Sequence, residues 1–221
     1  MTEFKICGIS EIDHAVAARR YGAYWIGFVF VPGVRREISV EKVKDIITQY
    51  RDLTGPGGPG IVGLFANQTL SEVSSISGQC DLDYVQLCGD EDDAYWSQLD
   101  FSIIKQIKVP SVGERSQIVD RLRQEVENVL GKDAIPLLDR LERGKLGGTG
   151  KSFDWSVAAE LPEDWDYVVA GGLDSGNVVE AIQQSNPWAV DVSSGVETDG
   201  EKETNKIKEF ADKVLGRDML T

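Results

Sequence analysis

The sequence predicts an α/β fold, a single (β/α)8 TIM barrel with a parallel closed sheet that spans residues 1–221 as one domain. Three observations predict it. Short aliphatic runs recur eight times, segments with helical periodicity lie between them, and 41% of the 221 residues are hydrophobic, which suffices for one sizeable core. A doubly wound open sheet competes, and strand counting alone does not exclude it. The number of strands favours the barrel.

Each expected strand is a short run rich in β-branched or aliphatic residues. The runs lie at 4–8, 24–30, 61–66, 84–88, 103–109, 135–139, 167–171 and 188–192. Helical faces separate them, as in the apolar set Val43, Ile46, Ile47 and Tyr50, and the segment 204–215 predicts a closing helix. Strand and helix therefore alternate, as a barrel requires.

Two helix starts carry the spacing of a capping box, in which a side-chain oxygen accepts from an otherwise unpaired backbone N–H. These are Ser10 with Asp13 and Thr69 with Glu72, and both follow an expected strand. The Pro/Gly-rich stretch 51–60 is interpreted as a surface loop within one repeat, because the pattern is unchanged on both sides.

The charge balance points to a small ligand. With 37 acidic and 23 basic residues, the formal charge of −14 argues against nucleic-acid or anionic-membrane partners, which need a basic surface. An anionic ligand would have to be held by local features such as backbone N–H groups at helix starts. A small molecule is the expected partner, and the chain is expected to be a monomer or a homodimer.

The cysteines and the single histidine exclude several kinds of site. Cys7, Cys80 and Cys88 are widely spaced and contain no CxxC pair, so neither a disulfide framework nor a zinc site is expected. His14 falls on the first expected helix, which argues against a His-based triad. No signal peptide or membrane-length run is found, so a cytoplasmic protein is predicted.

Cys7 ends the first expected strand, and the active sites of α/β barrels lie at such strand ends. Strand alternation places Lys5 and Cys7 on one face, and Phe4 and Ile6 on the helix-facing side. As a base, Cys7 needs a stabilised thiolate, for which Lys5 is the candidate. The alternative is that Cys7 is simply a small buried residue.

Asp139 and Asp191 also lie at strand ends. Asp139 follows four apolar residues, which packing explains poorly, although a helix cap or a salt bridge to Arg140 or Arg143 is an alternative. Asp191 is ranked second, because it could equally hold a loop in place.

Glycine-rich turns at 170–177 and 191–197 follow the last two strands, where barrels often bind phosphate through backbone N–H groups. Arg35 and Arg36 follow the second strand and are candidates to grip an anion, with a solvated surface pair as the alternative. The run at 145–152 fails the P-loop pattern because Lys145 stands where glycine is needed, and it is interpreted as a loop over the ligand or an ordinary turn.

Together, several motifs resemble phosphoribosylanthranilate isomerase, an enzyme of tryptophan biosynthesis, in order along the whole chain. They are KICGI at 5–9, GFVF at 27–30, RREIS at 35–39, VQLCGDE at 85–91, LLD at 137–139, GGTGKSFDW at 147–155, AGGLDSGNV at 170–178 and AVDVSSGVE at 189–197.

The resemblance implies an intramolecular oxidoreductase, an aldose-ketose isomerase that opens the ribose ring of N-(5-phosphoribosyl)anthranilate in an Amadori rearrangement, without metal or organic cofactor. It implies that Cys7 is the general base, Asp139 the general acid and Arg36 the residue that holds the anthranilate end. Such chemistry needs an acid and a base on opposite sides of the substrate. Phosphate is expected at the N–H groups of the two glycine turns, from Gly171, Gly172, Ser194 and Gly195, with Asp191 as a further substrate contact.

The sequence departs from the family where it has Cys88 in place of the usual histidine, and around Arg36 with Val34 and Glu37. These departures motivate an alternative, a noncatalytic phosphosugar-binding barrel. The related barrel isomerase of histidine biosynthesis is a second alternative, but resemblance to it calls for an aspartate where Cys7 stands.

Overall fold

A closed barrel of eight parallel strands, in the order β1 to β8, forms the centre of the computed structural model, which describes residues 1–55, 57–140 and 153–216. All eight expected strands are confirmed, and no strand end differs by more than two residues from the expected one. The open sheet is wrong, because β1 pairs with both β2 and β8. The strands are β1 (Glu3–Cys7), β2 (Trp25–Val29), β3 (Gly60–Phe65), β4 (Tyr84–Leu87), β5 (Ser102–Val109), β6 (Ile135–Arg140), β7 (Val168–Val169) and β8 (Ala189–Val192).

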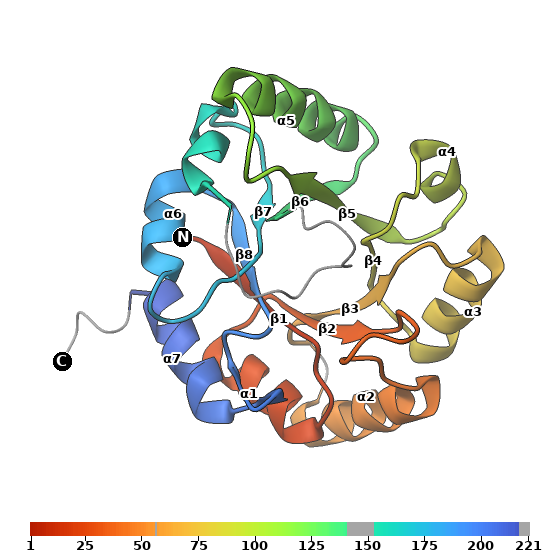
Figure 1. Cartoon of the computed structure of the whole chain (residues 1–221). Helices are drawn as coiled ribbons and strands as arrows, with labels where there is room; N and C mark the ends of the chain where they lie inside the picture. Colours follow the sequence, from red (N-terminus) through yellow and green to blue (C-terminus); the bar gives the residue numbers. More distant parts are fainter. Residues whose placement is uncertain (56, 141–152, 217–221) are drawn as a thin grey trace.

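Helices surround the barrel as an outer ring (Figure 1). They are α1 (Ile12–Tyr21), α2 (Val40–Thr54), α3 (Leu70–Cys80), α4 (Asp93–Trp96), α5 (Arg115–Leu130), the 3-10 helix η1 (Trp155–Glu160), α6 (Val178–Ser185) and α7 (Thr204–Val214). A short antiparallel hairpin of β9 (Glu197–Thr198) and β10 (Glu201–Lys202) lies between β8 and α7. Among the described helices, none is long and apolar enough to cross a membrane.

One of the two expected capping boxes is confirmed. The Thr69 hydroxyl accepts from the backbone N–H of Glu72, whose carboxylate accepts from the backbone N–H of Thr69. The Ser10 box is wrong: α1 begins at Ile12 with Glu11 as its N-cap, one residue too late for this spacing, and no side chain caps it. The loop at 51–60 is wrong in its first four residues, because α2 continues to Thr54.

Strand alternation separates two hydrophobic layers. Phe4 and Ile6 pack in the layer between strands and helices, whereas Cys7 faces the barrel interior. At the start of β2, the fully buried ring of Trp25 packs edge-on against Tyr84 and Trp188, with ring centroids 5.4 and 5.0 Å apart. These rings fill the amino-terminal end of the barrel, so the opposite, carboxyl-terminal end is the mouth.

Candidate active site

A buried ion pair lies beneath the mouth. Lys5 on β1 and Asp191 on β8 stand side by side in the strand register, and Lys5 Nζ donates to both carboxylate oxygens at 3.0 Å. The Lys5 side chain is fully buried and that of Asp191 is 8% exposed. Burial lowers the pKa of Lys5, but the charges of Asp191 and Cys7 and the hydrogen bonds with both together raise the pKa overall. Lys5 is therefore held as an ammonium ion inside the barrel.

Cys7 lies one pleat above Lys5 on the same interior face, at the end of β1. Burial raises the pKa of its thiol, while the Lys5 ammonium lowers it and the Asp191 carboxylate raises it. The net direction is upward. Lys5 thus favours the thiolate, as the sequence predicted, but it does not outweigh burial because Asp191 neutralises much of its charge.

Asp139 lies near the end of β6, on the interior face that it shares with Leu137. Gln106 on β5 donates from Nε2 to one carboxylate oxygen at 2.7 Å, and the backbone N–H of Arg140 donates to the other at 2.8 Å. A Cβ at Gly171 would lie 2.5 Å from Asp139 Oδ1, so the loop after β7 approaches this carboxylate closely. Gln106 fixes the direction in which Asp139 points.

Cys7 and Asp139 face each other across the mouth. Counting through β8 and β7, their strands β1 and β6 are three steps apart in a barrel of eight. Both side chains are on the interior face at the carboxyl ends of these strands. A ligand in the mouth therefore has a thiol on one side and a carboxyl group on the other.

Arg36 follows β2 and makes a two-point contact with Glu197 on β9. Its Nε donates to Oε1 at 2.7 Å and its Nη2 to Oε2 at 3.0 Å. Arg35 donates to Oε2 at 2.6 Å. Burial raises the pKa of Glu197, but hydrogen bonds from Arg36 and Arg35 lower it to about 2. The interpretation of both arginines as a solvated surface pair is wrong for Arg36, whose side chain is 15% exposed.

Lys202 on β10 connects this cluster to β1, through Ser193. Its Nζ donates to Glu197 Oε1 and to the carbonyl oxygen of Ser193, both at 3.2 Å. The Ser193 hydroxyl donates in turn to the carbonyl oxygen of Cys7 at 3.0 Å. Burial lowers the pKa of Lys202, although Glu197 opposes this shift.

The two glycine-rich turns meet at the mouth. Asp174, after β7, and Gly195, after β8, form an isolated parallel bridge. Any side chain at Gly195 would collide with the carbonyl oxygen of Leu173, so only glycine allows this approach. The segments that contain Gly171, Gly172, Ser194 and Gly195 are therefore neighbours, as a shared phosphate site would require. Asn177 supports the first turn by donating from Nδ2 to the carbonyl oxygen of Gly172 at 2.8 Å.

Cys88 faces the barrel interior and belongs to the same apolar cluster as Cys7. Its Sγ accepts from Gln86 Nε2 at 3.4 Å. Burial raises the pKa of this thiol to about 12, so it is uncharged at neutral pH.

Other expectations have mixed outcomes. The run 145–152 and Arg143 lie outside the described residues. His14 lies on α1 as expected. Its pKa is lowered, mainly by burial and to a lesser extent by the charge of Lys202. Within residues 1–55, 57–140 and 153–216, no group of three or more His, Cys, Asp or Glu side chains is arranged to hold a metal ion.

Sequence reasoning missed Gln106, Glu197 and Lys202 as parts of the site. A signal existed for Gln106, because it alternates with Ile104 on an expected strand and so has to face the interior with it. Glu197 is in the final quoted motif but drew no role. Lys202 had no local signal.

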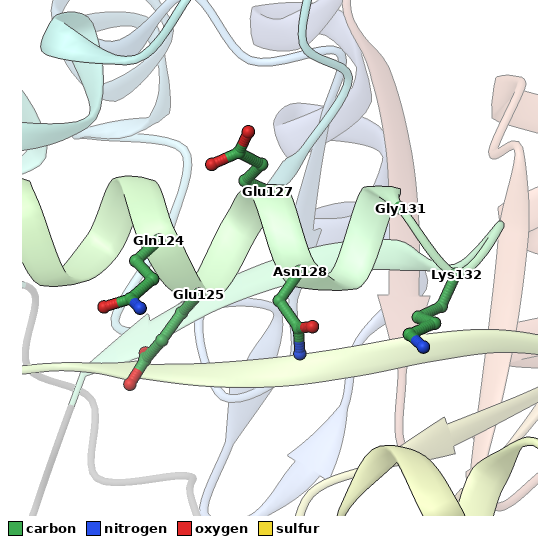
Figure 2. Close-up of a pocket in the computed structure, with 6 residues that line it drawn as sticks. All are labelled: Gln124, Glu125, Glu127, Asn128, Gly131 and Lys132. Atoms are coloured by element: carbon green, nitrogen blue, oxygen red, sulfur yellow. The ribbon is translucent and has the colours of Figure 1, made fainter.

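A separate surface pocket lies along the last turns of α5 (Figure 2). It is on the outer ring of helices and includes none of the predicted site residues. Its lining residues are Gln124, Glu125, Glu127, Asn128, Gly131 and Lys132.

Comparison with known proteins agrees with this geometry. The family model for N-(5'-phosphoribosyl)anthranilate (PRA) isomerase matches residues 4–213. The N-(5'-phosphoribosyl)anthranilate isomerase of Dehalococcoides mccartyi is 39% identical over 218 residues, which cover 99% of this chain and 98% of the relative.

Solved structures show the same fold. The phosphoribosyl anthranilate isomerase of Thermotoga maritima superposes with a TM-score of 0.80 at 30% identity, covering 98% of this chain and all (100%) of that one. Another isomerase structure, a complex with reduced 1-(o-carboxyphenylamino)-1-deoxyribulose 5-phosphate, gives a TM-score of 0.77 at 30% identity over 98% of this chain and 100% of that chain. This chain therefore belongs to the N-(5'-phosphoribosyl)anthranilate isomerase family.

Proposed function

We propose that this chain, acting as a single domain over residues 1–221, converts N-(5-phosphoribosyl)anthranilate to 1-(2-carboxyphenylamino)-1-deoxyribulose 5-phosphate, with Cys7 as general base and Asp139 as general acid. Membership of the family supports the reaction. The observation that best supports the two roles is that a thiol and a carboxyl group face each other across the barrel mouth, from β1 and β6.

The reaction requires only proton transfers and bond rearrangements within the substrate. Asp139 donates a proton to the ring oxygen as its bond to C1′ breaks, and the anthranilate nitrogen lone pair forms a C=N bond at C1′. The Cys7 thiolate removes the proton from C2′, and the released electron pair forms an enol-amine. Addition of a proton at C1′, with loss of the proton from the C2′ hydroxyl, gives the ketone. Atoms and electrons balance without a redox partner.

The remaining groups bind the two ends of the substrate. Arg36, on the Cys7 side, is proposed to hold the anthranilate carboxylate. The backbone N–H groups of Gly171, Gly172, Ser194 and Gly195 are proposed to hold the phosphate. Contact between the two turns supports this assignment, as does the phosphorylated sugar analogue bound by a solved relative. Asp191 stays a predicted substrate contact, and the ion pair with Lys5 holds it in place.

The partners proposed are small molecules, without nucleic acid or membrane, and the proposed location is the cytoplasm. The oligomeric state stays a prediction of a monomer or a homodimer. The isomerase of Thermotoga maritima is a dimer from which monomers have been generated.

The activity is tested by mixing the purified chain with freshly made N-(5-phosphoribosyl)anthranilate and following the loss of anthranilate fluorescence. We expect turnover well above the spontaneous rate. Turnover no faster than the spontaneous rate, together with tight product binding by calorimetry, would instead establish the noncatalytic phosphosugar-binding alternative that Cys88 motivated.

A further inference from the structure

The Glu197 carboxylate, on the β9–β10 hairpin, accepts hydrogen bonds from several cationic side chains. Three cationic side chains, those of Arg35, Arg36 and Lys202, donate to its carboxylate, which is 5% exposed. Cationic groups therefore outnumber the carboxylate three to one in a protein whose overall formal charge is −14. Such a local positive excess is suited to an anionic ligand.

The contact between Arg36 and Glu197 uses one edge of the guanidinium group. Nε and Nη2 donate to the two carboxylate oxygens in a two-point geometry that fixes the plane of the group. Nη1 has no hydrogen-bond partner among the residues that the structure describes. The edge formed by Nη1 and the second N–H of Nη2 is therefore available to a second carboxylate.

The stem of Arg36 is directed to the catalytic strand. A Cβ at Gly8, which follows Cys7, would lie 2.7 Å from Arg36 Cδ, so the arginine side chain runs directly over this glycine. Gly8 has a φ of +78°, which favours glycine independently of this contact. Ser193 and Lys202 complete a ring of contacts from the Cys7 carbonyl back to Glu197.

From this arrangement we propose that Glu197 is a positioning residue, which holds Arg36 so that its open edge receives the anthranilate carboxylate beside Cys7. This inference rests on the proposed function. It assigns Glu197 no contact with the reacting atoms, and its effect is transmitted entirely through Arg36.

Positioning and simple charge attraction predict opposite results for Glu197→Gln. The substitution removes a negative charge next to the anion site, so electrostatics alone predicts tighter binding of an anionic ligand. If Glu197 positions Arg36, the substitution instead frees the guanidinium group to move, and binding of the carboxylate weakens. The direction of the change therefore decides between the two.

Calorimetry with two ligands tests the proposal. The first is reduced 1-(o-carboxyphenylamino)-1-deoxyribulose 5-phosphate, and the second is its phenylamino counterpart without the carboxylate. For Glu197→Gln we expect the Kd of the first ligand to rise at least about tenfold, the scale of a charge-assisted two-point contact, and that of the second to change less than about twofold. In turnover, KM should rise more than kcat falls.

Two further variants keep the test decisive. Glu197→Asp retains the charge but shortens the side chain, and it should show the same selective loss even if Glu197→Gln fails to fold. Glu160→Gln is the control, because it breaks a surface carboxylate contact with Arg115, 2.8 Å long, between η1 and α5. This control should bind both ligands as the wild type does.

Unchanged or tighter binding of the carboxylate ligand by the Glu197 variants, or an equal loss for both ligands, would overturn the inference while leaving wild-type turnover intact. If the wild-type chain neither binds these ligands nor turns over substrate, the proposed function itself is wrong and the inference fails with it.

Discussion

Replacing Lys5 by methionine would remove the cation that Asp191 contacts inside the barrel while filling a similar volume. Both side chains are buried, and Nζ lies 3.0 Å from each carboxylate oxygen. Removing one partner of such a pair leaves a buried charge without compensation, which costs about 3–5 kcal/mol. We expect the Lys5→Met variant to lose stability on this scale at pH 7.

The loss of stability caused by Lys5→Met has an upper limit that depends on pH. An aspartic acid in water gives up its proton near pH 3.9, so a buried carboxylate can escape its charge by binding a proton, at about 1.4 kcal/mol per pH unit above that value. The ceiling is about 4 kcal/mol at pH 7 and about 1.5 kcal/mol at pH 5. In the wild type, the raised pKa of Lys5 means that its contribution is complete below its unfolded value and is lost only in alkali, so it is constant between pH 5 and 7.

Urea unfolding at pH 7 and pH 5 measures this effect. The free energy of unfolding of Lys5→Met should fall about 3–4 kcal/mol below that of the wild type at pH 7, and the gap should narrow to about 1–2 kcal/mol at pH 5. Lys42→Met breaks an exposed pair with Glu11 and serves as the control, with an expected loss under about 1 kcal/mol. A loss for Lys5→Met below about 1 kcal/mol at pH 7, or an equal loss at both pH values, would refute this reasoning.

Three other predictions follow from single contacts. Thr69→Ala removes the hydroxyl of the capping box of α3 and should lower the free energy of unfolding by about 1 kcal/mol in urea; no change would show that the box contributes nothing. Cys88→Ala should leave turnover within about threefold of wild type, because burial raises the pKa of this thiol to about 12 and keeps it neutral; a loss of about a hundredfold would place Cys88 among the reacting groups. The pKa of Glu197 is lowered to about 2, so the stability that its ionised form contributes is present above the unfolded pKa of about 4.3 and is lost as the pH falls toward 2. The difference in unfolding free energy between the wild type and Glu197→Gln should therefore shrink below about pH 4.5. A constant difference down to about pH 3 would contradict this assignment.

The barrel was predictable because its signals are local. Each strand is a short apolar run, and alternation correctly placed Lys5 and Cys7 on the interior face. Local signals failed where elements are very short: β9 and β10 have two residues each, too few to show a periodicity. The Ser10 box failed because α1 begins one residue later than that spacing requires, with Glu11 as its N-cap.

The connections within the site were less predictable, because they join distant parts of the chain. Lys5 and Asp191 are 186 residues apart, and they pair only because barrel closure places β8 beside β1. The contact of Arg36 with Glu197 spans 161 residues in the same way. Sequence alone identified the residues at the mouth, but the partners that set their charge and direction required the closed barrel.

The central claim, that Cys7 and Asp139 act as an acid–base pair across the barrel mouth, is tested most directly by single-turnover fluorescence measurements on Cys7→Ser and Asp139→Asn. Both substitutions preserve side-chain size and remove only the ionisable function. Turnover of N-(5-phosphoribosyl)anthranilate should fall at least about a hundredfold in each variant, the scale of a lost general base or acid. A rate close to that of the wild type in either variant would contradict the assignment of that residue.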